Sequence, residues 1–384
     1  MDMNYSQYFT EDHESIRSLA REFAEKSLAP IAKEVDENDH FPEALIKEMA
    51  ELGFFGLKIP EEYGGLGLDM RSYVCVMEEL SRKCPVASIF VSSANSLGSG
   101  PLLLYGTDAQ KEKYLPAIAE GEALLCFGLT EPGAGSDAAA ITTKAVKDGD
   151  DYILNGRKCF ITKAPIADYT VIFAKTAPEL GAKGITAFMV DMKLPGVSTG
   201  KPEEKMGQRG IPVSDVLLED VRVSSDCIIG EVNAGFINAM KTLNFGRLGV
   251  AAMSLGMAGE ALDLAVEYVK NRVQFGKPLA KQQSLRFMLS NMQTQLSAAR
   301  LMVYDAAYRL DQGEDVSIQA SMAKYFATEA SLKIITDALQ LHGGYGYTKE
   351  YAIELLFRDS RVNTIYEGST QVQQMVIARG VLGE

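Results

Sequence analysis

The sequence has no tryptophan and only three histidines among its 384 residues. The histidines, His13, His40 and His342, are scattered and form no H-E-x-x-H motif, which argues against a histidine-based zinc site. The five cysteines include no C-x-x-C pair. An odd number of dispersed thiols in a long chain is typical of reduced cysteines in a cytosolic protein. We therefore expect neither a metal site nor a disulfide framework.

Long hydrophobic runs and excess positive charge are also missing. No stretch reaches about 18 apolar residues free of charge, and the N-terminal residues have neither a basic nor an apolar segment, so we expect no membrane span, no signal peptide and a cytoplasmic location. Lysine and arginine number 38 against 51 aspartates and glutamates, a formal net charge of −13. This balance argues against nucleic acid as the main partner, so a polyanionic ligand requires a few well-placed cations.

Hydrophobic patterning divides the chain into three segments. Residues 1–123 have helical apolar spacing, and the Thr107-x-x-Gln110 capping box begins one of the helices. Residues 124–231 contain short β-rich runs, with hairpin-type turns expected at Asp148-Gly149 and Asn155-Gly156. Residues 232–384 return to long helices. We predict an α+β fold with an N-terminal helical domain, a central β-barrel or sandwich domain and a C-terminal four-helix bundle.

Two common motifs, one for dinucleotide binding and one for a nucleophilic serine, are matched only in part. Gly133-x-Gly135 lacks the third glycine of a dinucleotide fingerprint, since position 138 is alanine, and no strand–helix unit surrounds it. The G-x-S-x-G pattern at residues 196–200 follows Pro195 and precedes Lys201-Pro202, where a hydrolase requires a helix. We therefore expect neither a nicotinamide-binding domain nor a serine hydrolase.

Four other strings are more specific. They are GLTEPGAGSD at residues 128–137, NRVQFGKP at 271–278, QLHGGYGY at 340–347 with Glu350, and IYEG at 365–368. The first, by composition alone, reads as a Gly-rich loop between two domains. All four occur in the order found in acyl-CoA dehydrogenases, and the helix–β–helix layout matches as well. The whole chain resembles that family, in its short-chain or butyryl-type members.

The resemblance implies a reaction and a base. Family members oxidise the Cα–Cβ bond of an acyl-CoA thioester to the trans-2-enoyl-CoA: a carboxylate removes the α-proton, the β-hydride passes to FAD N5, and electrons go on to an electron-transferring flavoprotein. Glu367 in the IYEG string is the implied base. Its apolar neighbours favour a raised carboxyl pKa, although an arbitrary Glu at such a position is an ordinary acid at a helix start.

The resemblance also implies binding residues and an assembly. The substrate groove is assigned to Ser136, Asn244, Arg247, Tyr366 and Gly368. The FAD contacts are assigned to Phe127, Leu129, Thr130, Phe160, Ile161, Thr162, Arg272, Phe275, Gln283, Gln340, Gly343, Gly344, Ser369, Thr370 and Gln371. Family habit makes the protein a homotetramer, with Gln340, Gly343 and Gly344 lent to a neighbouring subunit's FAD.

The chain departs from the family pattern at several positions. Phe160 stands where tryptophan is usual, Lys163 where asparagine is common, Asn244 where many relatives have aspartate, and Leu355 where lysine or arginine is normal. Ser369-Thr370 inverts the usual order. These differences leave open the acyl group, the electron acceptor and the physiological direction. An enoyl-CoA reductase, an acyl-CoA oxidase, a desulfinase-like enzyme and a non-catalytic helical scaffold remain as alternatives.

Overall fold

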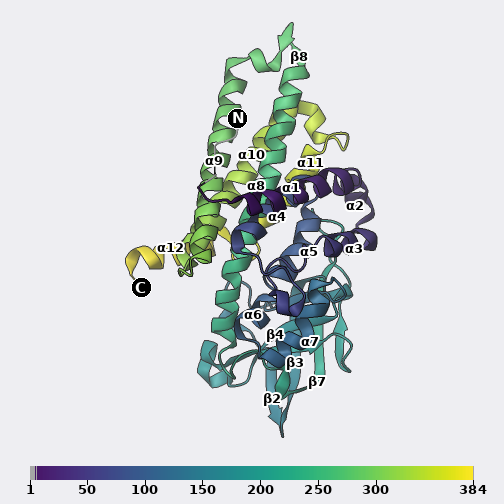
Figure 1. The fold of residues 1–384 in the computed structure, drawn as a ribbon, viewed down its shortest axis with the longest axis vertical. Coiled ribbons are helices and arrows are strands. Elements are labelled where there is room, and N and C mark those ends of the chain that lie inside the picture. Colours follow the sequence, from purple (N-terminus) through teal and green to yellow (C-terminus); the bar gives the residue numbers. More distant parts are fainter. Residues whose placement is uncertain (1–4, 6, 384) are drawn as a thin grey trace.

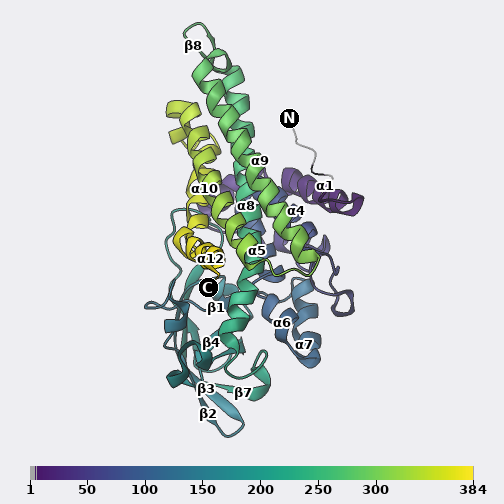
Figure 2. The same cartoon turned by 90° about the vertical axis from the view of Figure 1, so that its left-hand side faces the viewer.

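The computed structural model describes residue 5 and residues 7–383 and confirms the helix–β–helix layout. The β-sheet occupies one end of an elongated molecule, the N-terminal helices lie between the sheet and the middle of the molecule, and long C-terminal helices extend toward the other end (Figure 1). Figure 2 shows that α12 lies beside the bundle, close to the sheet end.

The N-terminal helices pack around α4, which is almost entirely buried. Their bounds are α1 Glu11–Phe23, α2 Ala32–Asn38, α3 Glu43–Glu51, α4 Met70–Lys83, α5 Pro85–Asn95, α6 Gly100–Tyr105 and α7 Asp108–Ala119. The predicted capping box is present: the Thr107 hydroxyl accepts from the Gln110 backbone N–H, and the Gln110 side chain accepts from the Thr107 backbone N–H. Such pairing satisfies N–H groups that the first helical turn leaves free.

The β domain is one mixed seven-stranded sheet in the order β1-β4-β2-β3-β7-β6, with β5 paired to β4. Its strands are β1 Leu125–Gly128, β2 Lys144–Asp148, β3 Asp151–Thr162, β4 Tyr169–Lys175, β5 Ile185–Asp191, β6 Val197–Thr199 and β7 Val213–Ser224. The turn at Asp148-Gly149 joins β2 to β3 as predicted, with Gly149 at φ +65°.

The second predicted hairpin turn, at Asn155-Gly156, is wrong. Strand β3 runs through both residues, and its pairing with β7 shifts register between Leu154 and Gly156, which marks a β-bulge. A Cβ on Gly156 would lie 2.3 Å from Thr143 Oγ1, so glycine is required here by a close approach and not by a turn.

The C-terminal domain is built on α8 Gly235–Asn271, α9 Gln283–Asp311 and α10 Ser317–His342. A short hairpin of β8 Val273–Gln274 and β9 Lys277–Pro278 joins α8 to α9 at the far tip, and α11 Ile353–Ser360 and α12 Thr370–Leu382 complete the domain (Figure 1). By length and composition α8 could cross a membrane, but 83% of its most apolar window is buried inside the protein, as in a core helix.

Candidate functional site

The Glu367 carboxylate is the centre of the candidate site. It lies in the short segment between the 3-10 turn Arg361–Thr364 and α12, and its backbone has φ +52°, a left-handed conformation that few non-glycine residues adopt. Carboxylate oxygen Oε2 is buried and has no hydrogen-bond partner among the described residues. Burial raises the pKa of Glu367 to about 7, against the opposing charges of Lys324 and Arg247. A strained backbone and an unpartnered carboxylate are typical of a functional group.

Helix α8 makes room for this carboxylate at Gly246. A Cβ built on Gly246 would lie 2.0 Å from Glu367 Oε2 and 3.1 Å from Leu97 Cδ2. The carboxylate, α8 and the chain just beyond α5 therefore meet at one point. A glycine inside a helix destabilises it by about 1 kcal/mol relative to alanine, so the close approach explains its presence.

The backbone that carries Glu367 is held from two sides. Lys324 Nζ, on α10, donates to the Gly368 carbonyl at 2.8 Å, and Gln373 Nε2, on α12, donates to the carbonyls of Glu367 and Gly368 at 3.2 and 2.9 Å. Gly368 itself has φ +93°. Fixing both carbonyls keeps the left-handed turn, and with it the carboxylate, in one orientation.

Arg247 is a buried cation next to the carboxylate. Its Nη1 donates to Asn244 Oδ1 at 2.8 Å, and Asn244 Nδ2 in turn donates to Ser317 Oγ at 3.1 Å. Arg247 Nε is buried without a partner among the described residues. Burial lowers the pKa of Arg247 and the charge of Glu367 raises it. A guanidinium N–H without a protein partner is available to a polar ligand group.

A buried hydrogen-bond network holds Tyr366, the residue that precedes Glu367. Tyr366 OH donates to Asn363 Oδ1 at 2.9 Å, Gln208 Nε2 donates to the same oxygen at 3.1 Å, and Asn363 Nδ2 donates to Ser254 Oγ at 2.9 Å. Gln208 belongs to the loop between β6 and β7, and its Nε2 also donates to Tyr366 OH at 3.4 Å, so the β domain contacts the side chain of the residue before Glu367. Burial raises the pKa of Tyr366 well above its ordinary value, so its hydroxyl stays protonated.

Six of the predicted FAD contacts lie together on β1, β3 and the residues that follow β1. These six are Phe127, Leu129, Thr130, Phe160, Ile161 and Thr162. The Cys159 backbone N–H donates to the Thr130 carbonyl at 2.9 Å and joins the two segments. Phe160 has φ +56° and its side chain is 67% exposed, so an aromatic ring is held outward at this edge.

The other predicted FAD contacts from the C-terminal domain gather elsewhere. Arg272, Gly343 and Gly344 line a groove of about 490 Å³. Phe275, 94% exposed with φ +53°, lies in the adjacent β8–β9 hairpin. The β8 hairpin is at the opposite end of the bundle from the β-sheet in both views (Figures 1 and 2). The predicted FAD contacts therefore form two separate surfaces on one chain. Arg272 lies on the same surface as Gly343 and Gly344, which the family resemblance assigns to the FAD of a neighbouring subunit.

The remaining predicted residues are placed as follows. Gln283 is the exposed first residue of α9, and Gln340 is exposed near the end of α10. Ser136 is exposed in the loop after β1. Ser369 caps α12 by accepting from the Val372 backbone N–H, Thr370 is buried with its hydroxyl bonded to Glu329, and Gln371 is exposed.

Sequence reasoning missed four supporting residues: Gly246, Lys324, Gln373 and Gln208. Two had signals. Gly246 interrupts an otherwise strong helical pattern, which indicates close packing. Lys324 shares a helix face with Ala320 and Ala327, so a lysine there points into a packed surface of small residues. Gln208 and Gln373 had none, because their roles depend on elements distant in sequence.

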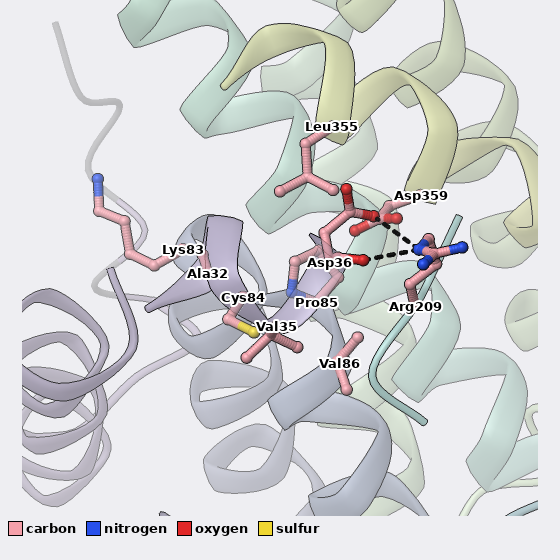
Figure 3. A pocket seen from close by; sticks show the side chains of 10 residues that line it. All are labelled: Ala32, Val35, Asp36, Lys83, Cys84, Pro85, Val86, Arg209, Leu355 and Asp359. Atoms are coloured by element: carbon pink, nitrogen blue, oxygen red, sulfur yellow. Dashed lines mark hydrogen bonds and ion pairs between the residues drawn. The ribbon is translucent and has the colours of Figure 1, made fainter. Parts of the chain in front are cut away.

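Leu355 lines a small cavity that shares none of its lining residues with the Glu367 site. The cavity has about 10 Å³ of free volume, room for at most one water, and lies among α2, the start of α5 and α11 (Figure 3). Asp36 and Asp359 face each other there beside Leu355. Burial raises the pKa of Asp359 to about 7. No metal-binding cluster of His, Cys, Asp or Glu occurs in the part of the chain that the structure describes.

Family models match the chain in three consecutive pieces. The model of the acyl-CoA dehydrogenase N-terminal domain matches residues 10–122, that of the middle domain residues 126–221, and that of the C-terminal domain residues 233–382. Together they span almost the whole chain.

Individual proteins are similar over their full length. A 3-(aryl)acrylate reductase from Clostridium sporogenes is 59% identical, covering 98% of this chain and 100% of that protein. The caffeyl-CoA reductase-Etf complex subunit CarC from Acetobacterium woodii is 54% identical, covering 97% and 98%. The structure of butyryl-CoA dehydrogenase from Megasphaera elsdenii has a TM-score of 0.96 with 42% identity, covering 100% of both chains.

Proposed function

The chain belongs to the acyl-CoA dehydrogenase family, and from this premise we propose that its working reaction is the reduction of a 3-aryl-2-enoyl-CoA. It is a flavin-dependent oxidoreductase with FAD as its cofactor. Dehydrogenation of the saturated acyl-CoA is the same reaction in reverse. Both directions need one group that exchanges a proton at Cα, and the Glu367 carboxylate is that group.

The single observation that carries the proton-exchange role of Glu367, in either direction, is the state of this carboxylate. A buried oxygen without a partner and a pKa of about 7 mean that acid and base forms are both populated near neutral pH. The protonated form can donate to Cα during reduction, and the ionised form can remove the same proton during oxidation. The neighbouring Arg247 and Lys324 charges keep the ionised form accessible.

The residues present fit FAD. Cβ atoms built on Gly343 and Gly344 would meet no heavy atom within 4 Å, so the backbone is open to a ligand along the groove that Arg272 lines. A guanidinium there suits a pyrophosphate. Bound FAD supplies hydride transfer at Cβ. Because this groove is distant from Glu367 in one chain, we propose that each FAD is held between two chains, as in a homotetramer.

The direction and acyl class rest on the names of two relatives. Proteins 59% and 54% identical are named for reduction of aryl acrylate and caffeyl-CoA, and the second is named as part of an Etf complex. Both substrates place an aromatic ring on Cβ. We therefore propose an electron-transferring flavoprotein as the electron partner and a cytoplasmic location.

An anaerobic flavin titration tests the proposal. The reduced enzyme is mixed with 3-phenylacryloyl-CoA or crotonyl-CoA, and the oxidised enzyme with 3-phenylpropanoyl-CoA or butyryl-CoA, while the flavin band is followed. We expect the aryl enoyl thioester to reoxidise the flavin at least about tenfold more efficiently than crotonyl-CoA. Preference for crotonyl-CoA contradicts the acyl class, and no flavin band after FAD is added indicates a scaffold. In a separate aerobic assay with the saturated thioester, oxygen uptake without another acceptor indicates an oxidase.

A further inference from the structure

Gln208 is a buried residue of the β domain with a strained backbone. It lies in the loop between β6 and β7, is 6% exposed, and has φ +48°, a left-handed conformation that is unfavourable for a non-glycine residue. Its backbone N–H donates to Asp359 Oδ1 on α11, which holds this conformation in place. Strain that the surrounding structure maintains indicates that the direction of the Gln208 side chain serves a function.

The side-chain amide of Gln208 is directed at the residues that precede Glu367. Its Nε2 lies within hydrogen-bond distance of Asn363 Oδ1 at 3.1 Å, the Asp359 carbonyl at 3.3 Å and Tyr366 OH at 3.4 Å. Tyr366 OH donates in turn to Asn363 Oδ1 at 2.9 Å. Tyr366 and Glu367 share one planar peptide bond, so holding Tyr366 also restricts the backbone from which the Glu367 side chain starts.

The same loop is fixed to the strand end that carries predicted FAD contacts. It runs directly into β7, whose first residue, Val213, pairs with Thr162 at the end of β3. The Lys163 backbone N–H donates to the Pro212 carbonyl at 2.7 Å. Gln208 is four residues before Pro212, so one short piece of chain joins the predicted FAD contacts on β3 to the segment that carries the base.

The residues on either side of Gln208 hold the loop against two other domains. A Cβ built on Gly207 would lie 2.4 Å from the Arg358 carbonyl oxygen, so the loop backbone packs directly on α11. Arg209 Nε donates to the Asp36 carbonyl on α2 at 2.6 Å. All three domains therefore meet at this loop, with Arg209 bonded to the N-terminal domain and Gln208 to the C-terminal one.

We propose that Gln208 is a positioning residue that fixes the Glu367 segment relative to the FAD contacts of the β domain. The reaction moves a proton at Cα and a hydride at Cβ of one bound thioester, so the carboxylate and the flavin must keep a fixed separation. Gln208 maintains it through the hydrogen bonds of its amide to Asn363 and Tyr366. This inference rests on the proposed function, which makes Glu367 the proton-exchanging group and FAD the hydride carrier.

The test separates an effect on rate from an effect on stability. Gln208→Met keeps an unbranched side chain of similar size and removes the amide. The matched control is Arg209→Met, which removes an interdomain hydrogen bond of the adjacent residue to α2. Anaerobic stopped flow follows flavin bleaching by 3-phenylpropanoyl-CoA and by butyryl-CoA. Calorimetry on the oxidised enzymes measures the dissociation constants of the corresponding enoyl thioesters, and the thermal midpoint is recorded for each protein.

We expect a loss of rate without a loss of binding. Bleaching by Gln208→Met slows by about tenfold to a hundredfold, because the carboxylate is no longer held in one place, and the dissociation constants stay within about threefold. Arg209→Met bleaches within about threefold of the wild-type rate, whatever its thermal midpoint. A wild-type rate in Gln208→Met, or an equal loss in Arg209→Met, overturns the inference and leaves the proposed function standing.

A double-mutant cycle with Tyr366→Phe asks whether Gln208 acts through Tyr366. Residues that act through one another have non-additive effects, so the double variant loses little more than the more impaired single variant. Losses in rate that multiply overturn the inference.

The remaining outcomes keep the two proposals apart. If butyryl-CoA bleaches the wild type and the aryl thioester does not, the proposed acyl class is wrong, and the butyryl-CoA rates decide this inference. A wild type that neither thioester bleaches overturns both. If Gln208→Met does not retain flavin, Gln208→Asn replaces it, because asparagine tolerates the left-handed backbone but is one methylene shorter. A rate lowered at least about tenfold then supports the inference, and a wild-type rate overturns it.

Discussion

Replacing Gly246 with alanine tests how tightly the catalytic carboxylate is placed. The added Cβ would lie 2.0 Å from Glu367 Oε2, whereas ordinary contact begins at 3.4 Å, so the oxygen must move by about 1.4 Å. Misplacement of about 1 Å can slow a reaction about a hundredfold, near 3 kcal/mol in transition-state free energy. Alanine favours a helix over glycine by about 1 kcal/mol, so the loss of activity is not expected to come from unfolding.

The assay is stopped-flow flavin reduction by 3-phenylpropanoyl-CoA, with the thermal midpoint recorded for each protein. Gly259→Ala on the same helix is the matched control, because its Cβ would meet the flexible end of Arg82 at 2.7 Å and nothing near Glu367. We expect the control to retain the wild-type rate. A Gly246→Ala protein that stays within about threefold of wild type refutes the geometric reasoning.

Three further predictions follow from the charges. Because the pKa of Glu367 is about 7, kcat/KM for dehydrogenation rises as the pH increases through 7, and kcat/KM for enoyl reduction falls. Rate profiles against pH in both directions measure this, and profiles that change in parallel contradict it. Lys324→Met removes a charge that favours the ionised carboxylate, so the pH midpoint moves upward by about one pH unit, and a downward shift contradicts this. Glu131→Gln leaves the buried Lys158 without the carboxylate that lies 2.8 Å from it, so the free energy of unfolding falls by about 3–5 kcal/mol. Asp215→Asn, which removes the exposed ion pair with Arg157, changes it by less than about 1 kcal/mol. Denaturant titrations measure both values.

Local sequence signals predicted the elements well where short-range physics decides them. The Thr107–Gln110 capping box is a contact between residues three apart, and the Asp148-Gly149 turn follows from the left-handed backbone that Gly149 adopts. Asn155-Gly156 has the same local signal, yet strand β7 pairs on both sides of it, and the register shift there places the extra residue on β7. Pairing with a distant strand is a tertiary contact that a dipeptide cannot encode.

The site was predictable only in part. The IYEG string identified Glu367, but the reason its pKa is raised includes an approach to Gly246 on a helix more than a hundred residues earlier in the chain. Lys163 follows the predicted FAD contact Thr162 directly, yet its side chain turns into the core to reach Ser93. Where a long side chain points depends on the space that distant elements leave for it.

The most direct test of the central claim is proton exchange at Cα by Glu367. Wild type and Glu367→Gln are mixed anaerobically with 3-phenylpropanoyl-CoA, and flavin bleaching and solvent deuterium incorporation at Cα are measured together. The amide cannot exchange the proton, so we predict that both rates fall by at least about a hundredfold while thioester affinity is retained. Wild-type bleaching and wild-type deuterium incorporation in Glu367→Gln would contradict the account.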